Sequence, residues 1–267
     1  QNCVNLETMV CSSAVSIIKA GAFKGCSSLK EADFSECTIS TIGYESFAGC
    51  TSLTSVKLQE TLSDIGVRAF EGTAVKTLEL GKNVNSIGKD LFLNNKVFEG
   101  FTVIDKNKEY SSVDGVLYNK KGNSLIMFPA GKTGAFELPQ GVSEIREGAF
   151  KNAAITEIKI SQDSALDTIG NNAFYKCSKL TGVKLSAKTK SIGNYAFYKC
   201  TNLTTITIPD SVTSIGYMAF SGCSRLTSVT IGNSITSIGI LAFSGCRSLT
   251  SITIPDSVTS IGADAFS

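Results

Sequence analysis

The sequence predicts a solenoid of stacked coils, α/β to mainly β in content, with a parallel β-sheet along one face. Two observations carry this prediction. A Gly-x-x-Ala-Phe pattern recurs along nearly all of the 267 residues, and an isoleucine stands five residues before each of its phenylalanines. Within each unit, one short run of alternating apolar and polar residues has the period of a half-buried strand. One strand per repeat of about 23 residues is the expected result.

The phenylalanines define the period of the repeat. Successive spacings are 24, 23, 22, 58, 24, 23, 23, 23 and 23 residues. Such self-similarity is the signature of stacked supersecondary units. Because a single coil leaves both of its open faces unburied, we expect neighbouring coils to stack and share one core. The ten phenylalanines in this phase are Phe23, Phe47, Phe70, Phe92, Phe150, Phe174, Phe197, Phe220, Phe243 and Phe266.

The unit at 203–223 shows why each coil folds as it does. β-Branched residues alternate at 206–208, which is typical of a short half-buried strand. Pro209 lacks the N–H group that a continuing ladder needs, so the strand ends there. The segment 216–220 is too short for more than one helical turn, and Gly222 suits a position with positive φ.

One spacing is far longer than the period and predicts an insert at 104–135. It separates Phe92 from Phe150 by 58 residues, about 35 more than one repeat. Two apolar runs, at 116–118 and 125–129, flank a polar turn, and this arrangement predicts a β-hairpin. The insert is either an elaboration packed on the sheet or a protrusion that contacts a ligand.

We expect a single solenoid domain over residues 1–267. Coils at 1–103 precede the insert, and coils at 136–267 follow it. No run of about 18 apolar residues occurs, so no membrane-spanning segment is predicted. The first residues show neither the charged nor the apolar region of a signal peptide. Because both ends fall partway through a repeat, we expect the chain to be a piece of a longer protein.

The pattern Leu-x-x-Ile-x-Ile-Pro, followed by Ile-Gly-x-x-Ala-Phe-x-Gly-Cys, resembles the leucine-rich repeats of BspA-like surface proteins. The resemblance covers nearly the whole chain and recurs in ten copies. It implies a leucine-rich-repeat solenoid, a right-handed curved rod, displayed extracellularly on the surface of a bacterium. It also implies adhesion, with a host extracellular protein or a surface glycan as the partner.

Composition argues against catalysis. The chain contains no histidine, which excludes Ser-His and Cys-His nucleophilic arrangements. Its 23 acidic residues are scattered, and no pair is marked by a motif. The net charge of +2 is spread along the chain, without the basic stripe of a nucleic-acid-binding protein. We therefore expect no enzymatic activity, no cofactor, no metal site and no nucleic-acid partner.

Seven of the nine cysteines occupy one position of the repeat, three residues before the leucine that precedes each strand. Stacking would bring neighbours within the Cα range of a disulfide. Thr73, Asn95 and Ala153 stand at the same position in other coils, which indicates a need for a small side chain. We expect buried free thiols, and Cys37, in a turn, as the most reactive one. The seven are Cys3, Cys26, Cys50, Cys177, Cys200, Cys223 and Cys246.

The outward side chains of the predicted sheet are the candidate ligand contacts. Charges alternate in the first part of the middle outward column, which suits cross-strand pairing. Lys159 beside Lys184 instead places two like charges side by side. This stretch is either a solvated charged face or a patch for an acidic protein or glycan. The candidates in the column are Lys57, Glu79, Glu137, Lys159, Lys184, Thr207 and Thr230.

Two aromatic–basic pairs, Tyr175-Lys176 and Tyr198-Lys199, lie 23 residues apart, so we expect them to stack at the rim. The lysines stand where other repeats have glycine, which predicts a strained turn. Aromatic rows are plausible contact points for a partner. Together these features predict a non-catalytic, surface-displayed binding or adhesion module. The alternative is a structural spacer or stalk without a ligand of its own.

Overall fold

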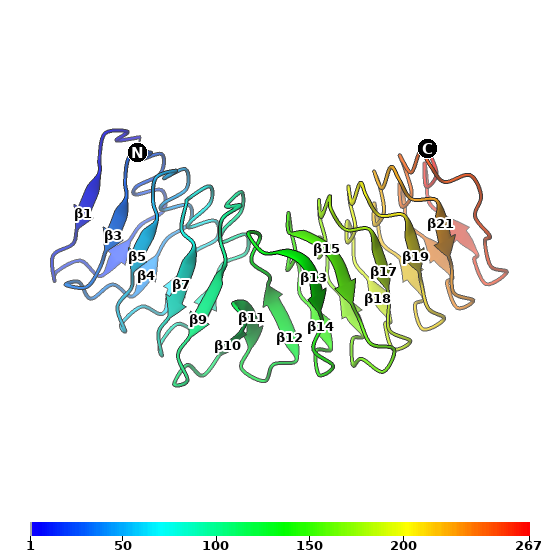
Figure 1. Ribbon diagram of the computed structural model, residues 1–267, viewed down its shortest axis with the longest axis horizontal. Helices are drawn as coiled ribbons and strands as arrows, with labels where there is room; N and C mark the ends of the chain where they lie inside the picture. Colours follow the sequence, from blue (N-terminus) through cyan, green and yellow to red (C-terminus); the bar gives the residue numbers. More distant parts are fainter. Residues whose placement is uncertain (1) are drawn as a thin grey trace. The chain divides into compact units, whose positions relative to one another are not determined.

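The computed structural model describes residues 2–267, and every regular element in it is a β-strand. The chain forms two units, one of residues 2–121 with 129–131 and the other of residues 122–128 with 132–267. Each unit is a stack of coils whose strands lie side by side (Figure 1). The predicted solenoid is confirmed, and its mainly β form is the correct one. No helix, and hence none able to span a membrane, occurs over residues 2–267. The single-domain organisation stays a prediction.

In most coils of the second unit, one strand of three to six residues joins one sheet and a two-residue strand joins another, while the last coil contributes only a two-residue strand. The longer strands pair in parallel, in sequence order. They are β13 (Thr133–Glu137), β15 (Ala154–Lys159), β17 (Gly182–Lys184), β19 (Thr205–Thr207) and β21 (Ser228–Thr230). The second sheet contains β12 (Ser124–Met127), β14 (Glu144–Ile145), β16 (Thr168–Ile169), β18 (Ser191–Ile192), β20 (Ser214–Ile215), β22 (Ser237–Ile238) and β23 (Ser260–Ile261).

The first unit has the same plan, but its longer strands fall into two separate parallel sheets. One contains β1 (Thr8–Val10), β3 (Glu31–Asp33) and β5 (Ser55–Lys57), and the other contains β7 (Thr77–Leu80) and β9 (Gly100–Val103). The short strands are β2 (Ile17–Ile18), β4 (Thr41–Ile42), β6 (Asp64–Ile65) and β8 (Ser86–Ile87).

The insert contains one strand more than the sequence analysis predicted. β10 (Tyr110–Val113) and β11 (Val116–Asn119) form an antiparallel hairpin. Asp114 and Gly115 connect them with φ values of 48° and 75°. An Asp-Gly pair with positive φ at both residues is a favoured two-residue hairpin turn. Strand β12 follows and pairs in parallel with β14.

The hairpin packs on the edge of β9. The backbone N–H of Phe101 donates to the carbonyl of Gly115 at 2.9 Å, and that of Val103 donates to the Ser112 hydroxyl at 3.0 Å. Leu117 of the hairpin is fully buried. Covering an edge in this way protects its unpaired backbone groups. The contacts match the interpretation of the insert as a structural elaboration.

The repeat phenylalanines form a stacked column in the core of each unit. In the second unit, the Phe197 ring lies 4.9 Å from the Phe174 ring and 5.2 Å from the Phe220 ring, with interplanar angles of 6° and 3°. All three rings are fully buried. Aromatic rings at this separation add attraction beyond the area that they bury. The column explains why every coil carries a phenylalanine at the same position.

In eight of the ten repeats a glycine follows the repeat isoleucine, and close backbone contact between coils requires it. A Cβ atom on Gly216 would lie 2.8 Å from the carbonyl carbon of Gly193 in the preceding coil. A Cβ atom on Gly239 would lie 2.7 Å from the carbonyl carbon of Gly216. No real Cβ atom approaches backbone this closely, so only glycine fits. Glycine in a repeat often marks such an approach.

The expected buried thiols are found at six of the seven repeat cysteines, and the seventh, Cys3, is exposed. The thiol of Cys200 donates to the Phe174 carbonyl at 3.1 Å. The prediction for Cys37 was wrong, because this residue is buried and forms a disulfide with Cys11. Turns of adjacent coils place the two Cα atoms 5.8 Å apart, within the range of a bridge.

Burial should make the repeat thiols unreactive in the folded protein. Desolvation raises the pKa of Cys200 and Cys223 well above the ordinary value, and the thiolate is the reactive form. We expect iodoacetamide at pH 8 to label Cys3 alone in the native protein. In denaturant the six buried thiols should also react, while the disulfide protects the remaining two cysteines. Peptide mass spectrometry measures this pattern, and native labelling of Cys200 would contradict it.

Candidate functional site

The outward face of the β13–β21 sheet carries most of the predicted column. Glu137 pairs in register with Lys159, Lys184 pairs with Thr207, and Thr207 pairs with Thr230. All five side chains are exposed, because successive residues of a strand point to opposite faces of the sheet. The structure therefore brings these five candidates together on one surface.

A hollow of about 980 Å³ lies on this face. Gly182 is one of its lining residues and lies in register with Glu157 on one side and Thr205 on the other. Each of these neighbours carries a side chain that the glycine lacks. The polar residues that border the hollow include Glu137, Glu157, Lys159, Lys184, Thr205 and Thr207.

Gly182 is not required by the backbone. Its φ lies outside the left-handed region, and a Cβ atom there would meet only the Thr205 hydroxyl oxygen, at an ordinary 3.7 Å. Gly216, by contrast, has no room for a Cβ atom, and Gly222 has a φ of 75°. A glycine inside a strand costs about 0.5–1 kcal/mol relative to alanine. A residue with a side chain would thus fit at this position and stabilise the strand.

The two lysines beside Gly182 have no protein partner for their charge. Among residues 2–267, neither Lys159 nor Lys184 takes part in an ion pair or a hydrogen bond through its side chain. Glu137 lies opposite Lys159 in register, but their charged atoms are not paired. Two exposed ammonium groups on adjacent strands therefore face the solvent at the hollow.

Lys57 in the first unit behaves differently. Its ammonium group lies 2.8 Å from a Glu31 oxygen and 3.0 Å from an Asp33 oxygen. These contacts raise the pKa of Lys57. Hydrogen bonds from Ser35 and then from Lys57 lower the pKa of Asp33 to about 2. The expected cross-strand pairing is confirmed for Lys57.

Glu79 does not pair with Lys57. It lies on β7, opposite Thr102 of β9, in a sheet separate from that of Lys57. Its side chain is exposed, and it forms no ion pair among residues 2–267. Neither Lys57 nor Glu79 lines the hollow. The alternating charges of the predicted column therefore do not all pair across strands.

The two aromatic–basic pairs stack in the turns of the second unit, as expected. The Tyr175 and Tyr198 ring centroids lie 5.0 Å apart with an interplanar angle of 18°. The ammonium groups of Lys176 and Lys199 lie 5.2 and 5.3 Å from the centroids of Tyr175 and Tyr198, respectively. Both lysines have positive φ, at 57° and 54°, which costs about 1–2 kcal/mol for a residue with a Cβ atom. None of the four lines the hollow.

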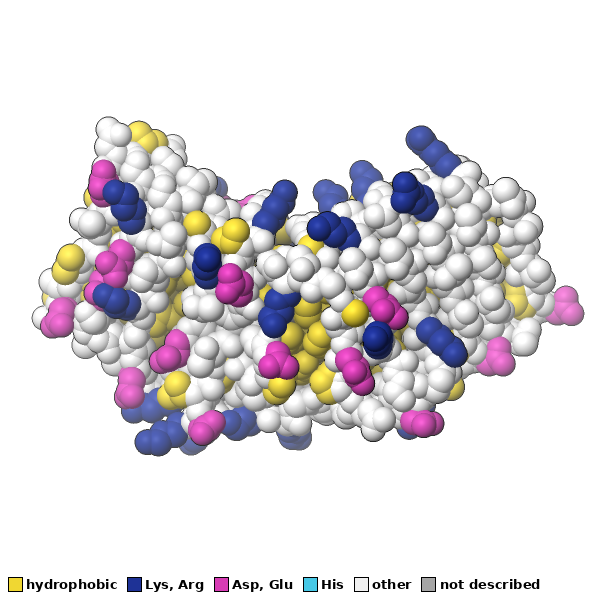
Figure 2. Space-filling view, in the orientation of Figure 1, with side chains coloured by type: hydrophobic (Ala, Val, Ile, Leu, Met, Phe, Trp, Pro, Cys, Tyr) yellow, Lys and Arg dark blue, Asp and Glu magenta, His cyan; other side chains and the backbone are white. Residues whose placement is uncertain are grey.

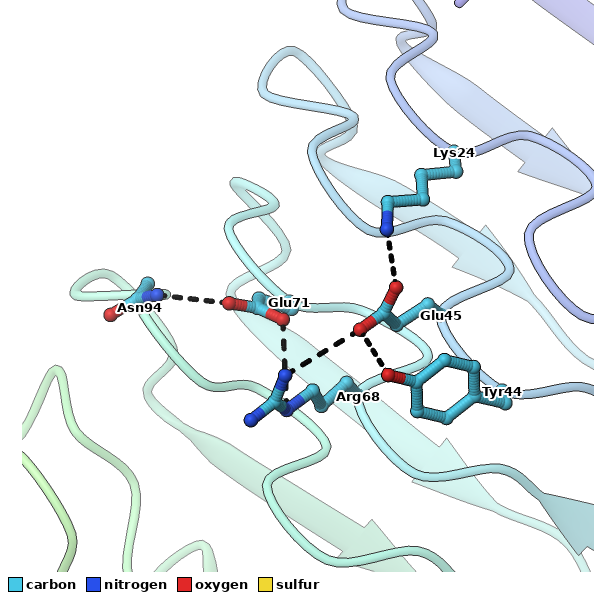
Figure 3. A network of polar contacts seen from close by, with 6 residues as sticks. All are labelled: Lys24, Tyr44, Glu45, Arg68, Glu71 and Asn94. Atoms are coloured by element: carbon cyan, nitrogen blue, oxygen red, sulfur yellow. Dashed lines mark hydrogen bonds and ion pairs between the residues drawn. The ribbon is translucent and has the colours of Figure 1, made fainter. Parts of the chain in front are cut away.

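The corresponding turns of the first unit are closed by their own ion pairs (Figure 3). Glu45, only 8% exposed, accepts a hydrogen bond from the Tyr44 hydroxyl and pairs with both Lys24 and Arg68. Arg68 also lies 3.9 Å from a carboxylate oxygen of Glu71. The hydrogen bond from Lys24 is the main cause of the lowered pKa of Glu45. Charge in these turns is neutralised within the protein.

The repeat and its stacking match a known family. The profile described as "BspA type Leucine rich repeat region" matches residues 1–109 and 143–267, in six copies. The chain belongs to the BspA-type leucine-rich-repeat family. A comparison with curated proteins finds no match.

Solved structures of other proteins are similar to this chain. The pneumococcal vaccine antigen PcpA is 26% identical with a TM-score of 0.75, over 92% of this chain and 66% of PcpA. A leucine rich cell surface protein from Faecalibacterium prausnitzii is 27% identical with a TM-score of 0.77, over 98% of this chain and 74% of that one. A leucine-rich repeat protein from Eubacterium ventriosum is 25% identical with a TM-score of 0.73, over 96% and 80%.

Sequence reasoning missed several residues of these BspA-type coils. Gly182 could have been found by aligning strands, because Thr205 stands at its position in the next coil. Tyr195 and Tyr217 also belong to the tyrosine group, with ring centroids 5.1 Å apart and nearly perpendicular planes. Their side-chain hydrogen bond is the main cause of the raised pKa of Tyr195. They were missed because they do not repeat at one position of the coil.

Proposed function

We propose that the chain is a non-catalytic binding or adhesion module whose ligand contacts the outward sheet face of the second unit. The observation that carries the proposal is Gly182, a glycine that neither φ nor backbone contact requires. It lines the hollow together with Lys159 and Lys184, which have no partner of opposite charge among residues 2–267. A strand that gives up stability to keep a polar hollow open is best explained by a ligand.

The chemistry of the hollow favours a protein or glycan partner with acidic and hydroxyl groups. Two ammonium groups can donate charge-assisted hydrogen bonds to a carboxylate or sulfate. The threonine hydroxyls and the carboxylates of Glu137 and Glu157 can exchange hydrogen bonds with hydroxyl groups of the partner. A host extracellular protein or a surface glycan meets this description.

An extracellular, cell-surface location is part of the proposal. The Cys11–Cys37 disulfide supports it, because disulfides persist in oxidising compartments and are rare in the cytosol. The Faecalibacterium prausnitzii relative is described as a cell surface protein, which agrees with this location. The complete absence of histidine removes the commonest general base and supports a role without catalysis.

The proposal is tested by reversing the two unpaired charges at the hollow. We expect wild-type protein to bind saturably to at least one member of a panel of immobilised matrix proteins and bacterial surface glycans. Lys159→Glu with Lys184→Glu should weaken that binding at least tenfold, because each lost charged hydrogen bond is worth about 1.5–3 kcal/mol. Surface plasmon resonance measures the change.

A matched control separates the hollow from a general effect of charge. Lys19→Glu with Lys96→Glu makes the same change in net charge at exposed residues of the first unit. This control should bind like the wild type. Equal losses of binding affinity in both variants would contradict the proposed site. If the wild-type protein bound saturably to no member of the panel, the result would favour the alternative of a structural spacer without a ligand.

A further inference from the structure

A second surface of the second unit is separate from the hollow. We call it the turn ridge and define it as residues 170–177, 193–200, 216–223 and 239–246. The first two segments each contain lysine and asparagine, the first three contain tyrosine, and none of the four contains aspartate or glutamate. Figure 2 shows dark blue side chains along the upper edge of this unit, without magenta ones among them. The turn ridge therefore presents positive charge without internal neutralisation.

The cations of the turn ridge lie against tyrosine rings rather than carboxylates. Among the described residues, Lys176 and Lys199 form no ion pair, and each ammonium group lies over a tyrosine ring. In the first unit, Lys24 and Arg68 occupy comparable turns and are both paired with Glu45 (Figure 3). A cation held over a ring keeps its full charge for an anion that approaches from the solvent.

The two lysines of the turn ridge stand at a backbone position that favours glycine. Lys176 and Lys199 adopt φ values of 57° and 54° at the position where Gly222 and Gly245 have 75° and 71°. Glycine would adopt this conformation without strain. Two neighbouring coils instead hold a lysine there. Positive φ also occurs at other non-glycine residues of the coils, so the feature particular to these two coils is the charge that the lysine carries.

The distance between neighbouring coils, the stacked tyrosine rings and the hydrogen-bonded backbone N–H groups of the turn ridge narrow the class of ligand. Adjacent coils repeat at the 5.0 Å separation of the Tyr175 and Tyr198 rings, which is comparable to the length of one sugar unit in a linear polysaccharide. Those rings stack on each other, so their faces are not open platforms for nucleic-acid bases. The backbone N–H of Lys176 donates to Tyr198 and that of Lys199 to Ser221, so no strand edge is open to an extended peptide.

We propose that the turn ridge binds an acidic glycan that runs along the stacked coils. Carboxylate or sulfate groups of successive sugars would pair with Lys176 and Lys199. Half-exposed Tyr195, Tyr198 and Tyr217 would exchange hydrogen bonds with the sugar hydroxyls between them. This surface is independent of the hollow at Gly182 and can bind its ligand whether or not the hollow does.

The test uses two glycan probes and a variant that should not disturb the fold. Polygalacturonate supplies carboxylates and dextran sulfate supplies sulfates, so the two probes show which acid is preferred. Lys176→Gly with Lys199→Gly removes both charges and places glycine where other coils have it, so the melting temperature should not fall. We expect the dissociation constant for the preferred probe to rise at least tenfold, and wild-type binding to weaken steeply with salt.

Matched variants and probes make the outcome decisive. Lys188→Ala with Lys190→Ala removes the same charge from exposed positions outside the turn ridge, and Lys159→Glu with Lys184→Glu alters only the hollow. Both should bind the glycan within about threefold of the wild type, because screening weakens distant surface charges. Three results would each overturn the proposal. The first is an equal loss of glycan affinity in the Lys188/Lys190 control, and the second is no wild-type binding to either glycan. The third is tighter binding of polyglutamate or single-stranded DNA than of the glycans.

Discussion

Phe197→Ala is expected to lower the free energy of unfolding by about 3–5 kcal/mol, the range for truncating a large buried aromatic side chain. Phe197 is fully buried, and its ring stacks on rings from both neighbouring coils. Because each coil contacts only its neighbours, the cavity would weaken two coil interfaces at once. Equilibrium denaturation followed by circular dichroism measures the change.

Phe266→Ala is the matched control for this substitution. The ring of Phe266 stacks on Phe243 alone and is 42% exposed. We expect its removal to cost less than half as much as the removal of Phe197, because it leaves no enclosed cavity. If both substitutions lowered the free energy of unfolding equally, the stacked column would not be the main source of cohesion between coils.

Gly216→Ala is expected to destabilise the protein by about 1–3 kcal/mol, the typical cost of forcing an extra methyl group into a packed site. Its Cβ atom would lie 2.8 Å from backbone atoms of Gly193, which cannot move aside as a side chain can. The two coils would have to separate, and the hydrogen bonds of both would lengthen. A lower melting temperature in differential scanning calorimetry is the expected readout.

Gly141→Ala should stabilise the protein, the opposite of the effect expected for Gly216→Ala. A Cβ atom there would meet nothing within 4 Å, and its φ lies outside the left-handed region. Reducing the freedom of the unfolded chain then stabilises the protein by about 0.4–1 kcal/mol. If Gly216→Ala also raised the melting temperature, close backbone contact would not explain the glycine that follows eight of the ten repeat isoleucines.

The repeat was predictable because the inward positions of every coil follow one pattern. Phenylalanine and isoleucine recur in fixed phase, and stacking requires the same shape at each level of the core. The strand at 206–208 and its end at Pro209 follow from the alternation and from the missing N–H. Leucine-rich-repeat architecture was thus evident from residues that face the core.

Features that occur only once were harder to predict. The hairpin of β10 and β11 turns at Asp114-Gly115, a signal that the sequence analysis did not use. The Cys11–Cys37 disulfide joins turns of adjacent coils, and neither cysteine belongs to the repeat phase. A pattern shared by all coils carries no information about a contact that one pair of coils makes.

The candidate site was predicted only in outline. The outward column placed Lys159 and Lys184 side by side, as the structure does. Gly182 was overlooked because the candidate contacts were chosen for their side chains, and glycine has none. Periodicity also could not separate the paired Lys57 from the unpaired lysines, because pairing depends on side-chain geometry.

Gly182→Thr tests most directly whether the hollow is a binding site. The substitution installs the residue that the next coil has at this position, and a threonine in a strand is favoured over glycine by up to about 1 kcal/mol. We predict a higher melting temperature together with at least tenfold weaker binding to whichever ligand the wild-type protein captures from the panel. Opposite effects on stability and binding would show that the glycine serves the ligand. A variant that is more stable and binds as tightly as the wild type would contradict the account.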